Sequence, residues 1–143
     1  MTNQAITFPS FDRAEMLNCL RPYQRDVIEP LLDTHSEEDV AKLWLASEGP
    51  SGSAKFGGIG SDNQPFWDRV KAEFRMLVCG DEKYSSLRNK INETGKPSAQ
   101  AIIGLASLSI ASQLGVATAL IAPAITILLY VAVKVGINAW CSV

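Results

Sequence analysis

All but one of the formal charges of this 143-residue chain lie in its first two thirds. Of the 28 Asp, Glu, Lys and Arg residues, 27 lie before residue 97, and the last 47 residues contain only Lys134. So long an uncharged and largely apolar segment has to be removed from water, either inside a protein core or in a lipid bilayer. We therefore expect a charged part (residues 1–96) joined to an apolar tail (residues 97–143).

Helix start signals recur through the charged part, and no strand pattern of alternating polar and apolar residues is present. Asp12 and Glu15 fit a capping box, in which each residue's side chain accepts from the other's backbone amide. Three further starts are marked by proline or serine: Pro22, Ser36 and Pro65. Pro30 is expected to kink or end its helix near Glu29. The sequence predicts an all-α fold with four or five helices in residues 1–96.

A Gly/Ser-rich stretch at residues 48–64 interrupts these helices and is predicted to be a surface loop. It contains a lysine among glycines that are candidates for binding an anion or a partner: Lys55, Gly57, Gly58 and Gly60. The stretch does not fit the phosphate-binding P-loop, because that motif requires glycine before the lysine and Ser or Thr after it. Ala54 and Phe56 occupy these positions.

Residue types typical of catalytic and metal sites are sparse. The chain has one histidine, His35, in a predicted turn, and its acidic clusters fall at helix starts, where they complement the helix dipole. Cys19, Cys79 and Cys141 show no CxxC spacing, so we expect buried thiols in a reducing compartment, without disulfide or zinc. With a net charge of −2, nucleic acid is not an expected partner. No enzyme activity, cofactor or metal is predicted.

The apolar tail has the composition of a membrane segment but an awkward length. Residues 101–133 are 33 consecutive uncharged positions, which would extend about 50 Å as one helix, whereas the hydrocarbon core of a bilayer is about 30 Å thick. In one arrangement, a helix at 98–113 packs on protein or at the interface, and 115–133 crosses the membrane once. In the other, two spans are joined by a hairpin turn near Pro123.

Two rows of residues at four-residue spacing lie in the tail. The first is a ladder of small residues, Ser107, Ala111, Gly115 and Ala119, which favours close helix association in membranes. Such residues are also common inside water-soluble helical proteins. The second row is more polar and is the candidate pore-lining or partner-facing stripe: Thr126, Tyr130, Lys134 and Asn138. Pro123 is the candidate kink or turn.

Basic residues flank the start of the tail at Lys83, Arg88, Lys90 and Lys96, and only Lys134 follows. The positive-inside rule then predicts a membrane protein whose N-terminal domain is cytoplasmic. No cleavable signal peptide is expected at the N-terminus. This two-part plan resembles, in architecture alone, the small membrane effectors of bacterial anti-phage and abortive-infection systems.

Three functions follow from this sequence. The first is a non-enzymatic membrane protein whose tail self-associates into homo-oligomers and permeabilises the lipid bilayer. The second is a tail-anchored adaptor or accessory subunit that binds a cytoplasmic protein partner. The third is a water-soluble helical oligomer with its apolar tails bundled together.

Overall fold

The computed structural model describes residues 10–48, 64–93 and 98–142, and within these ranges it contains α-helices and one 3₁₀ turn but no strand. The expectation of an all-α fold is confirmed. The helices are α1 (Arg13–Asn18), α2 (Pro22–Leu32), α3 (Glu37–Glu48), α5 (Gln64–Cys79), α6 (Ser85–Asn92), α7 (Ala99–Leu114), α8 (Thr118–Val135) and α9 (Ile137–Cys141), with η1 (Glu82–Tyr84) between α5 and α6.

The helix starts form as their capping residues predict. The backbone N–H of Glu15 donates to Asp12 Oδ1 at 2.8 Å, and the N–H of Asp12 donates to a Glu15 carboxylate oxygen at 3.0 Å, completing the capping box of α1. At the start of α7, Ser98 Oγ accepts from the backbone N–H of Ala101 at 3.1 Å. These side chains satisfy amides that have no partner within their own helix.

The end of α2 differs from the prediction. The helix does not stop near Glu29 but runs through Pro30 to Leu32. Because Pro30 lies in the last turn, its missing N–H removes only one helical hydrogen bond. Leu31 and Leu32 pack against the core and hold this turn in place.

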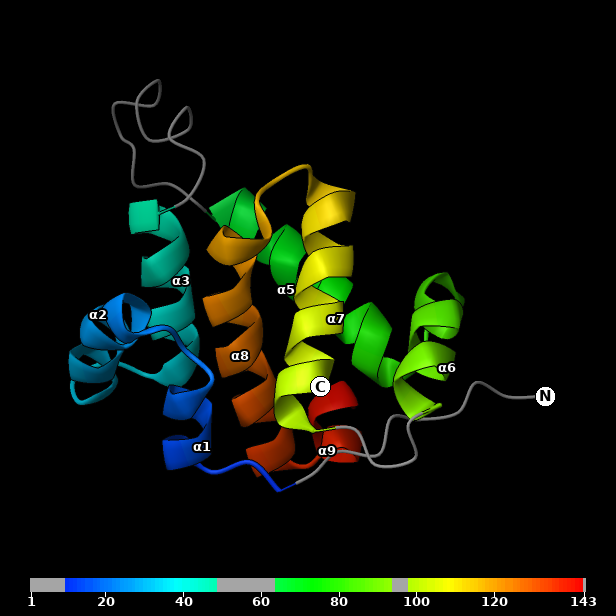
Figure 1. Cartoon of the computed structure of the whole chain (residues 1–143), viewed down its shortest axis with the longest axis horizontal. Coiled ribbons are helices and arrows are strands. Elements are labelled where there is room, and N and C mark those ends of the chain that lie inside the picture. The colour runs from blue at the N-terminus through cyan, green and yellow to red at the C-terminus, as the bar shows by residue number, and fades with distance from the viewer. Residues whose placement is uncertain (1–9, 49–63, 94–97, 143) are drawn as a thin grey trace.

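Helix α8 occupies the middle of the molecule. It lies between α3 and α7 and also contacts α1 and α5, as Figure 1 shows. The seven consecutive residues from Pro123 to Leu129 are all buried. Seven residues make almost two helical turns, so α8 is covered on every side along this stretch.

The charged part and the apolar tail share one hydrophobic core. Its buried members include Trp44 and Phe74 from the charged part and Ile102 and Ile125 from the tail. The aromatic side chains of Phe11, Trp44, Trp67 and Phe74 are all buried. The tail is therefore packed into the helices that precede it.

Helices α7 and α8 form a hairpin that turns at residues 115–117. Gly115 ends α7 in the left-handed conformation with φ of 72°, and the backbone N–H of Val116 donates to the carbonyl of Ala111 at 3.1 Å. Pro123 lies inside α8, at its sixth residue, and does not form the turn. The turn lies where glycine relieves the steric cost of a left-handed residue. We refer to residues 99–135 as the apolar hairpin.

Two glycines of the hairpin provide a matched test of this turn. A Cβ added at Gly115 or at Gly104 would meet no atom within 4 Å, but only Gly115 has a positive φ. We expect Gly115→Ala to lower the free energy of unfolding by about 1–2 kcal/mol. Gly104→Ala, within α7, should raise it by about 0.5–1 kcal/mol. Urea denaturation measures both, and equal effects would contradict the assigned turn.

Candidate functional site

Helix α8 has the length and composition of a membrane span. Within the described ranges it is the one helix that is long and apolar enough to cross a bilayer, and half of its 18 residues are buried inside the bundle. A helix that is hydrophobic on every face fits either the core of a protein or a membrane. In this structure, α8 takes the first of these environments.

The polar groups of α8 that lie in the core are satisfied by local partners. Thr126 Oγ1 donates to the carbonyl of Ala122 at 2.7 Å, and Trp44 Nε1 of α3 donates to the carbonyl of Leu120 at 2.9 Å. The first bond keeps a buried hydroxyl within its own helix, which is also how hydroxyls are accommodated in membrane helices. The second joins α8 to α3 close to Pro123.

The only charge of the apolar tail is paired with the charged part. Lys134 Nζ lies 3.1 Å from Glu37 Oε2 in the first turn of α3 and 5.5 Å from the ring centroid of Tyr130. A hydrogen bond from the backbone amide of Glu37 and one from Lys134 hold the pKa of the Glu37 carboxyl below its usual range. Tyr130 also packs edge-on against Phe11, with ring centroids 6.5 Å apart.

Two of the three cysteines form a disulfide, so the prediction of three buried thiols is wrong. Cys79, exposed at the end of α5, is bonded to Cys141, half-buried at the end of α9, with 5.7 Å between their Cα atoms. Cys19 is free and half-buried. Burial and the nearby carboxylate of Glu15 raise the pKa of its thiol, which disfavours the nucleophilic thiolate. The sequence carries no sign of this pairing, because the two cysteines are 62 residues apart and meet only through the fold.

Helix α9 is fixed to α5 by further contacts beside the disulfide. The Arg75 guanidinium donates to the carbonyls of Trp140 at 3.4 Å and Cys141 at 3.2 Å, and its carbon lies 5.2 Å from the Trp140 ring centroid. Phe74 packs edge-on against the same indole at 5.5 Å. The segment that follows α8 is thus held against the C-terminal half of α5.

The segment that precedes α7 is fixed at the same end of α5. The buried Arg88 of α6 donates to the carbonyls of Met76 at 3.1 Å and Leu77 at 2.9 Å, and also to that of Asp81. Carbonyls in the last turn of a helix lack partners within the helix, so this guanidinium stabilises the end of α5. The helices that flank the apolar hairpin in the sequence, α6 and α9, are therefore both held at the C-terminal end of α5.

Neither of the two rows predicted at four-residue spacing in the tail lies on a single helix. Ser107 and Ala111 are buried on α7, Gly115 is in the turn, and Ala119 is exposed near the start of α8. The small-residue ladder is therefore not one continuous helix face, because Gly115 ends α7. In the second row, Thr126, Tyr130 and Lys134 share a face of α8, and Asn138 is exposed on α9. The loop candidates Lys55, Gly57, Gly58 and Gly60 lie outside the described residues.

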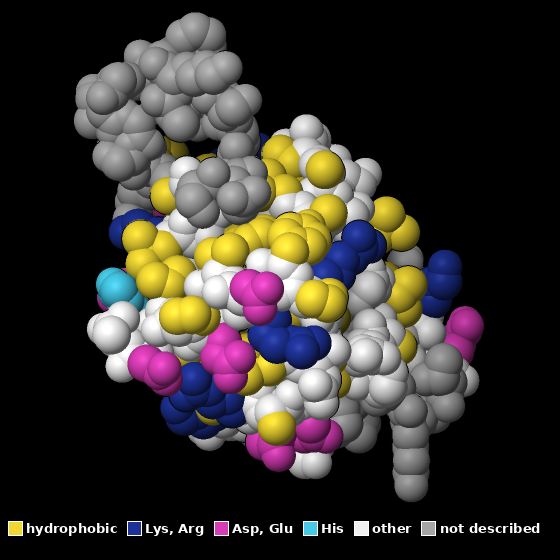
Figure 2. Space-filling model, turned by 60° about the vertical axis from the view of Figure 1, so that its left-hand side comes forward, with side chains coloured by type: hydrophobic (Ala, Val, Ile, Leu, Met, Phe, Trp, Pro, Cys, Tyr) yellow, Lys and Arg dark blue, Asp and Glu magenta, His cyan; other side chains and the backbone are white. Residues whose placement is uncertain are grey.

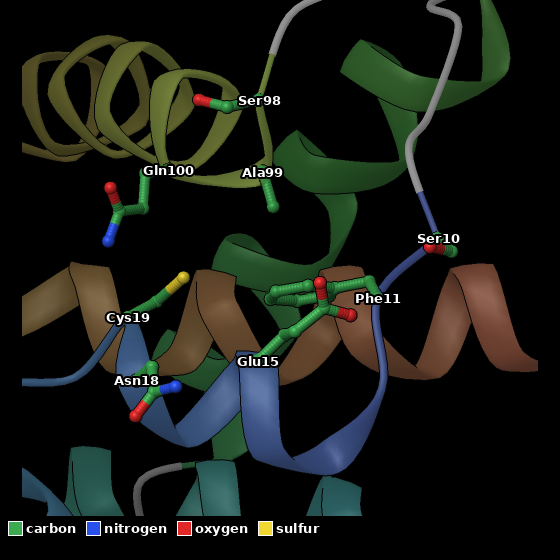
Figure 3. Close-up of a pocket in the computed structure, with 8 residues that line it drawn as sticks. All are labelled: Ser10, Phe11, Glu15, Asn18, Cys19, Ser98, Ala99 and Gln100. Atoms are coloured by element: carbon green, nitrogen blue, oxygen red, sulfur yellow. The ribbon is translucent and has the colours of Figure 1, made fainter.

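A pocket of about 310 Å³ lies between α1 and the first turn of α7. Figure 3 shows Ser98, Ala99 and Gln100 on one side of it, with Phe11, Glu15 and Cys19 on the other. Its titratable groups are one carboxyl and a thiol whose pKa is raised. His35 lies elsewhere, exposed beside the Thr34 hydroxyl. Among residues 10–48, 64–93 and 98–142, no group of three or more His, Cys, Asp or Glu could hold a metal.

The sequence matches no protein-family model, no curated protein and no solved structure. The most distinctive feature of the molecule is a helix with the composition of a membrane span, enclosed by α7 and by helices of the charged part. The sequence predicts no role in holding this helix or its flanking segments for the residues that the structure shows there: Trp44, Glu37, Arg75, Arg88 and the two bonded cysteines.

The disulfide provides a test of how the hairpin is held. Replacing both Cys79 and Cys141 by serine removes a cross-link between residues 62 positions apart. Because the unfolded chain is then less restricted, we expect the free energy of unfolding to fall by about 4 kcal/mol. Cys19→Ser, which leaves the bond intact, should change it by about 1 kcal/mol or less. Urea denaturation measures the difference. Three reactive thiols in the denatured but unreduced protein, instead of one, would contradict the bond.

The contact between Lys134 and Glu37 predicts a dependence on pH. Because the pKa of the Glu37 carboxyl is lowered in the folded state, its contribution to stability is full above the unfolded-state pKa of about 4.3. It is lost as the pH falls through the lower folded-state pKa. Glu37→Gln should therefore be less stable than the wild type at neutral pH but not below that folded-state pKa. Glu29→Gln is the control, because Glu29 is exposed and lies outside this contact. The free energy of unfolding, measured against pH, tests the account. A Glu37→Gln variant that stayed less stable than the wild type below the folded-state pKa would contradict it.

Proposed function

We propose that this protein is a non-enzymatic, membrane-active protein with two forms. In the first form it is a water-soluble helical bundle that covers α8. In the second form the apolar hairpin has entered a lipid bilayer. One observation carries this proposal: a helix with the composition of a membrane span is buried on all sides from Pro123 to Leu129, by the uncharged α7 and by helices of the charged part.

The energetics favour an exchange of one apolar environment for another. Burying each large aliphatic side chain of α8 is worth about 1.5–3 kcal/mol relative to water, so α8 does not leave the core for water. Lipid tails are as apolar as a leucine-rich core. The same side chains therefore remain shielded if a bilayer replaces α3 and α5 around α8.

The distribution of charge favours insertion with the turn entering first. The turn at residues 115–117 and the helices on either side of it have no charge until Lys134, which lies at the opposite end of α8. Moving a charged side chain to the bilayer centre costs about 2.5–3.5 kcal/mol on insertion scales. A hairpin that enters turn-first leaves Lys134 near the surface from which insertion started.

Self-association of inserted hairpins is the proposed route to permeabilisation. Leaving the bundle would free the face of α8 that holds Thr126, Tyr130 and Lys134 from Phe11 and Glu37. Polar side chains of this kind associate helices inside membranes. The small residues Ser107 and Ala111 on α7 would allow close approach of another copy. An effector of bacterial anti-phage type, the architecture noted from the sequence, would act in this way.

Two signals bear on the side from which the membrane is approached. The basic residues before the tail favour a cytoplasmic N-terminal part, whereas the disulfide between Cys79 and Cys141 favours an oxidising compartment. The positive-inside rule describes segments threaded during membrane insertion. A bundle that folds first presents its hairpin from the side on which it folded, so we give the disulfide more weight and propose a membrane location reached from an oxidising compartment.

A second candidate function is a water-soluble adaptor in which α8 stays in the core. The supporting observation is a set of exposed apolar side chains, Tyr23 and Val27 on α2 and Leu43 on α3. Figure 2, in which the α2 and α3 side of the molecule comes forward, shows hydrophobic side chains gathered on this face. Exposed apolar patches mark binding sites for protein partners.

A matched pair of variants at Ala117 separates these functions. Ala117 is the exposed N-cap residue of α8 and makes no side-chain capping bond. Ala117→Asp and Ala117→Ser each supply a good N-cap and should stabilise the bundle by about 0.5–2 kcal/mol. Only Asp adds a charge to the leading end of the hairpin. At neutral pH, we expect dye release from phosphatidylglycerol-containing vesicles to fall at least about tenfold for Asp relative to Ser.

Thermal unfolding of both variants checks that the bundle is stabilised equally. Equal dye release by the Asp and Ser variants would contradict turn-first insertion. No release by the wild type at any lipid composition, together with a stable monomer in detergent-free solution, would contradict a membrane-active function and favour the adaptor.

A further inference from the structure

We propose that the disulfide between Cys79 and Cys141 determines the topology of membrane insertion. While this bond is closed, the tail can enter a bilayer only as a hairpin, and the C-terminal end of the chain stays on the side of α5. This inference rests on the proposed function and deepens it, because it specifies how the same segment is inserted.

The bond encloses the apolar hairpin. Cys79 precedes α6 and α7, and Cys141 follows α8 and α9, so the covalent ring contains the whole of residues 99–135. A segment whose two ends are bonded together has both ends on one side of any membrane that it enters.

Helix α5 fixes which side that is. Within three turns before Cys79 it carries five charged side chains: Asp68, Arg69, Lys71, Glu73 and Arg75. Moving several charged side chains into hydrocarbon costs several times the free energy of moving one. Helix α5 therefore stays on the side from which insertion starts. Cys141 must then stay there too.

A single crossing by α8 is incompatible with this bond. It would place α9 and the end of the chain on the far side of a hydrocarbon core about 30 Å thick. The Cα atoms of Cys79 and Cys141 are 5.7 Å apart, a separation that the bond's geometry keeps below about 7 Å. The closed bond therefore excludes the single crossing and permits a hairpin. The hairpin turns at residues 115–117 and not near Pro123, where the sequence predicts the turn, and its first arm, α7, has 16 residues and is shorter than a full span.

Non-covalent contacts around the bond hold the helices that flank the hairpin in the sequence. Arg75 of α5 donates to the carbonyls of Trp140 and Cys141 in α9, and Arg88 of α6 donates to the carbonyls of Met76 and Leu77 in α5. In the proposed insertion, α6 and α9 stay with α5 while α7 and α8 leave the bundle together.

Reduction removes this restriction. Cys79 is exposed, so a dithiol reductant can attack the bond. The two thiols of the reductant are oxidised to a disulfide. Cys79 and Cys141 each gain an electron and a proton and become thiols. The C-terminal segment is then covalently free of α5, and a single span of α8 becomes available.

The test is the protease sensitivity of an epitope added after Val143. The full chain, oxidised, is bound to vesicles of phosphatidylcholine and phosphatidylglycerol and recovered by flotation, and protease is added outside. A reference protein enclosed in the vesicles stays uncleaved as long as the protease does not reach the lumen, and serves as the control for intact vesicles. We expect a protected fragment containing the hairpin and complete loss of the epitope. An epitope protected in the oxidised protein would overturn the proposal.

Two further samples test whether the bond itself decides the topology. Cys19→Ser, which keeps the bond, should match the wild type. The Cys79→Ser/Cys141→Ser variant, and wild type reduced with a dithiol before binding, should protect the epitope in a measurable fraction of molecules. If both samples without the bond lost the epitope as completely as the oxidised protein does, the proposal would be overturned. The absence of any protected fragment in all samples would instead overturn the proposed function.

Discussion

The burial of α8 on every side is the constraint on which the rest of the structure depends. Pro123 to Leu129 form an unbroken buried stretch, and no amphipathic pattern is left to turn one face toward water. The other helices have to supply the cover, with α3 and α7 on opposite sides and α1 and α5 completing it (Figure 1). Of these covering helices, α1, α3 and α5 carry charged side chains, whereas α7 is uncharged like most of α8.

The end of α5 has a second organising role. It receives Arg88 from the segment before the hairpin, and it is bonded through Cys79 to the segment after it. In the proposed insertion, these flanking segments stay at the end of α5 and the turn at residues 115–117 moves furthest.

Local features of the fold could be predicted from the sequence, and long-range ones could not. The cap residues Asp12 and Ser98 predict their helix starts because capping acts within one turn. The sequence predicts a turn near Pro123 and places Gly115 in the small-residue ladder, whereas the chain turns at Gly115, which has the left-handed conformation. The pairings of Cys79 with Cys141 and of Lys134 with Glu37 join residues 62 and 97 positions apart. No local pattern encodes such pairs, because only the packing of α8 against α3 and α9 against α5 brings them together.

Amide hydrogen exchange with and without vesicles tests the central claim most directly. In solution, α3 and α8 should be protected together, because each buries the other. With phosphatidylglycerol-containing vesicles, we predict that the amides of α8 remain protected while those of α2 and α3 exchange faster, since lipid then shields α8 in place of protein. An unchanged protection pattern in α3 on vesicles from which dye is being released would contradict the account.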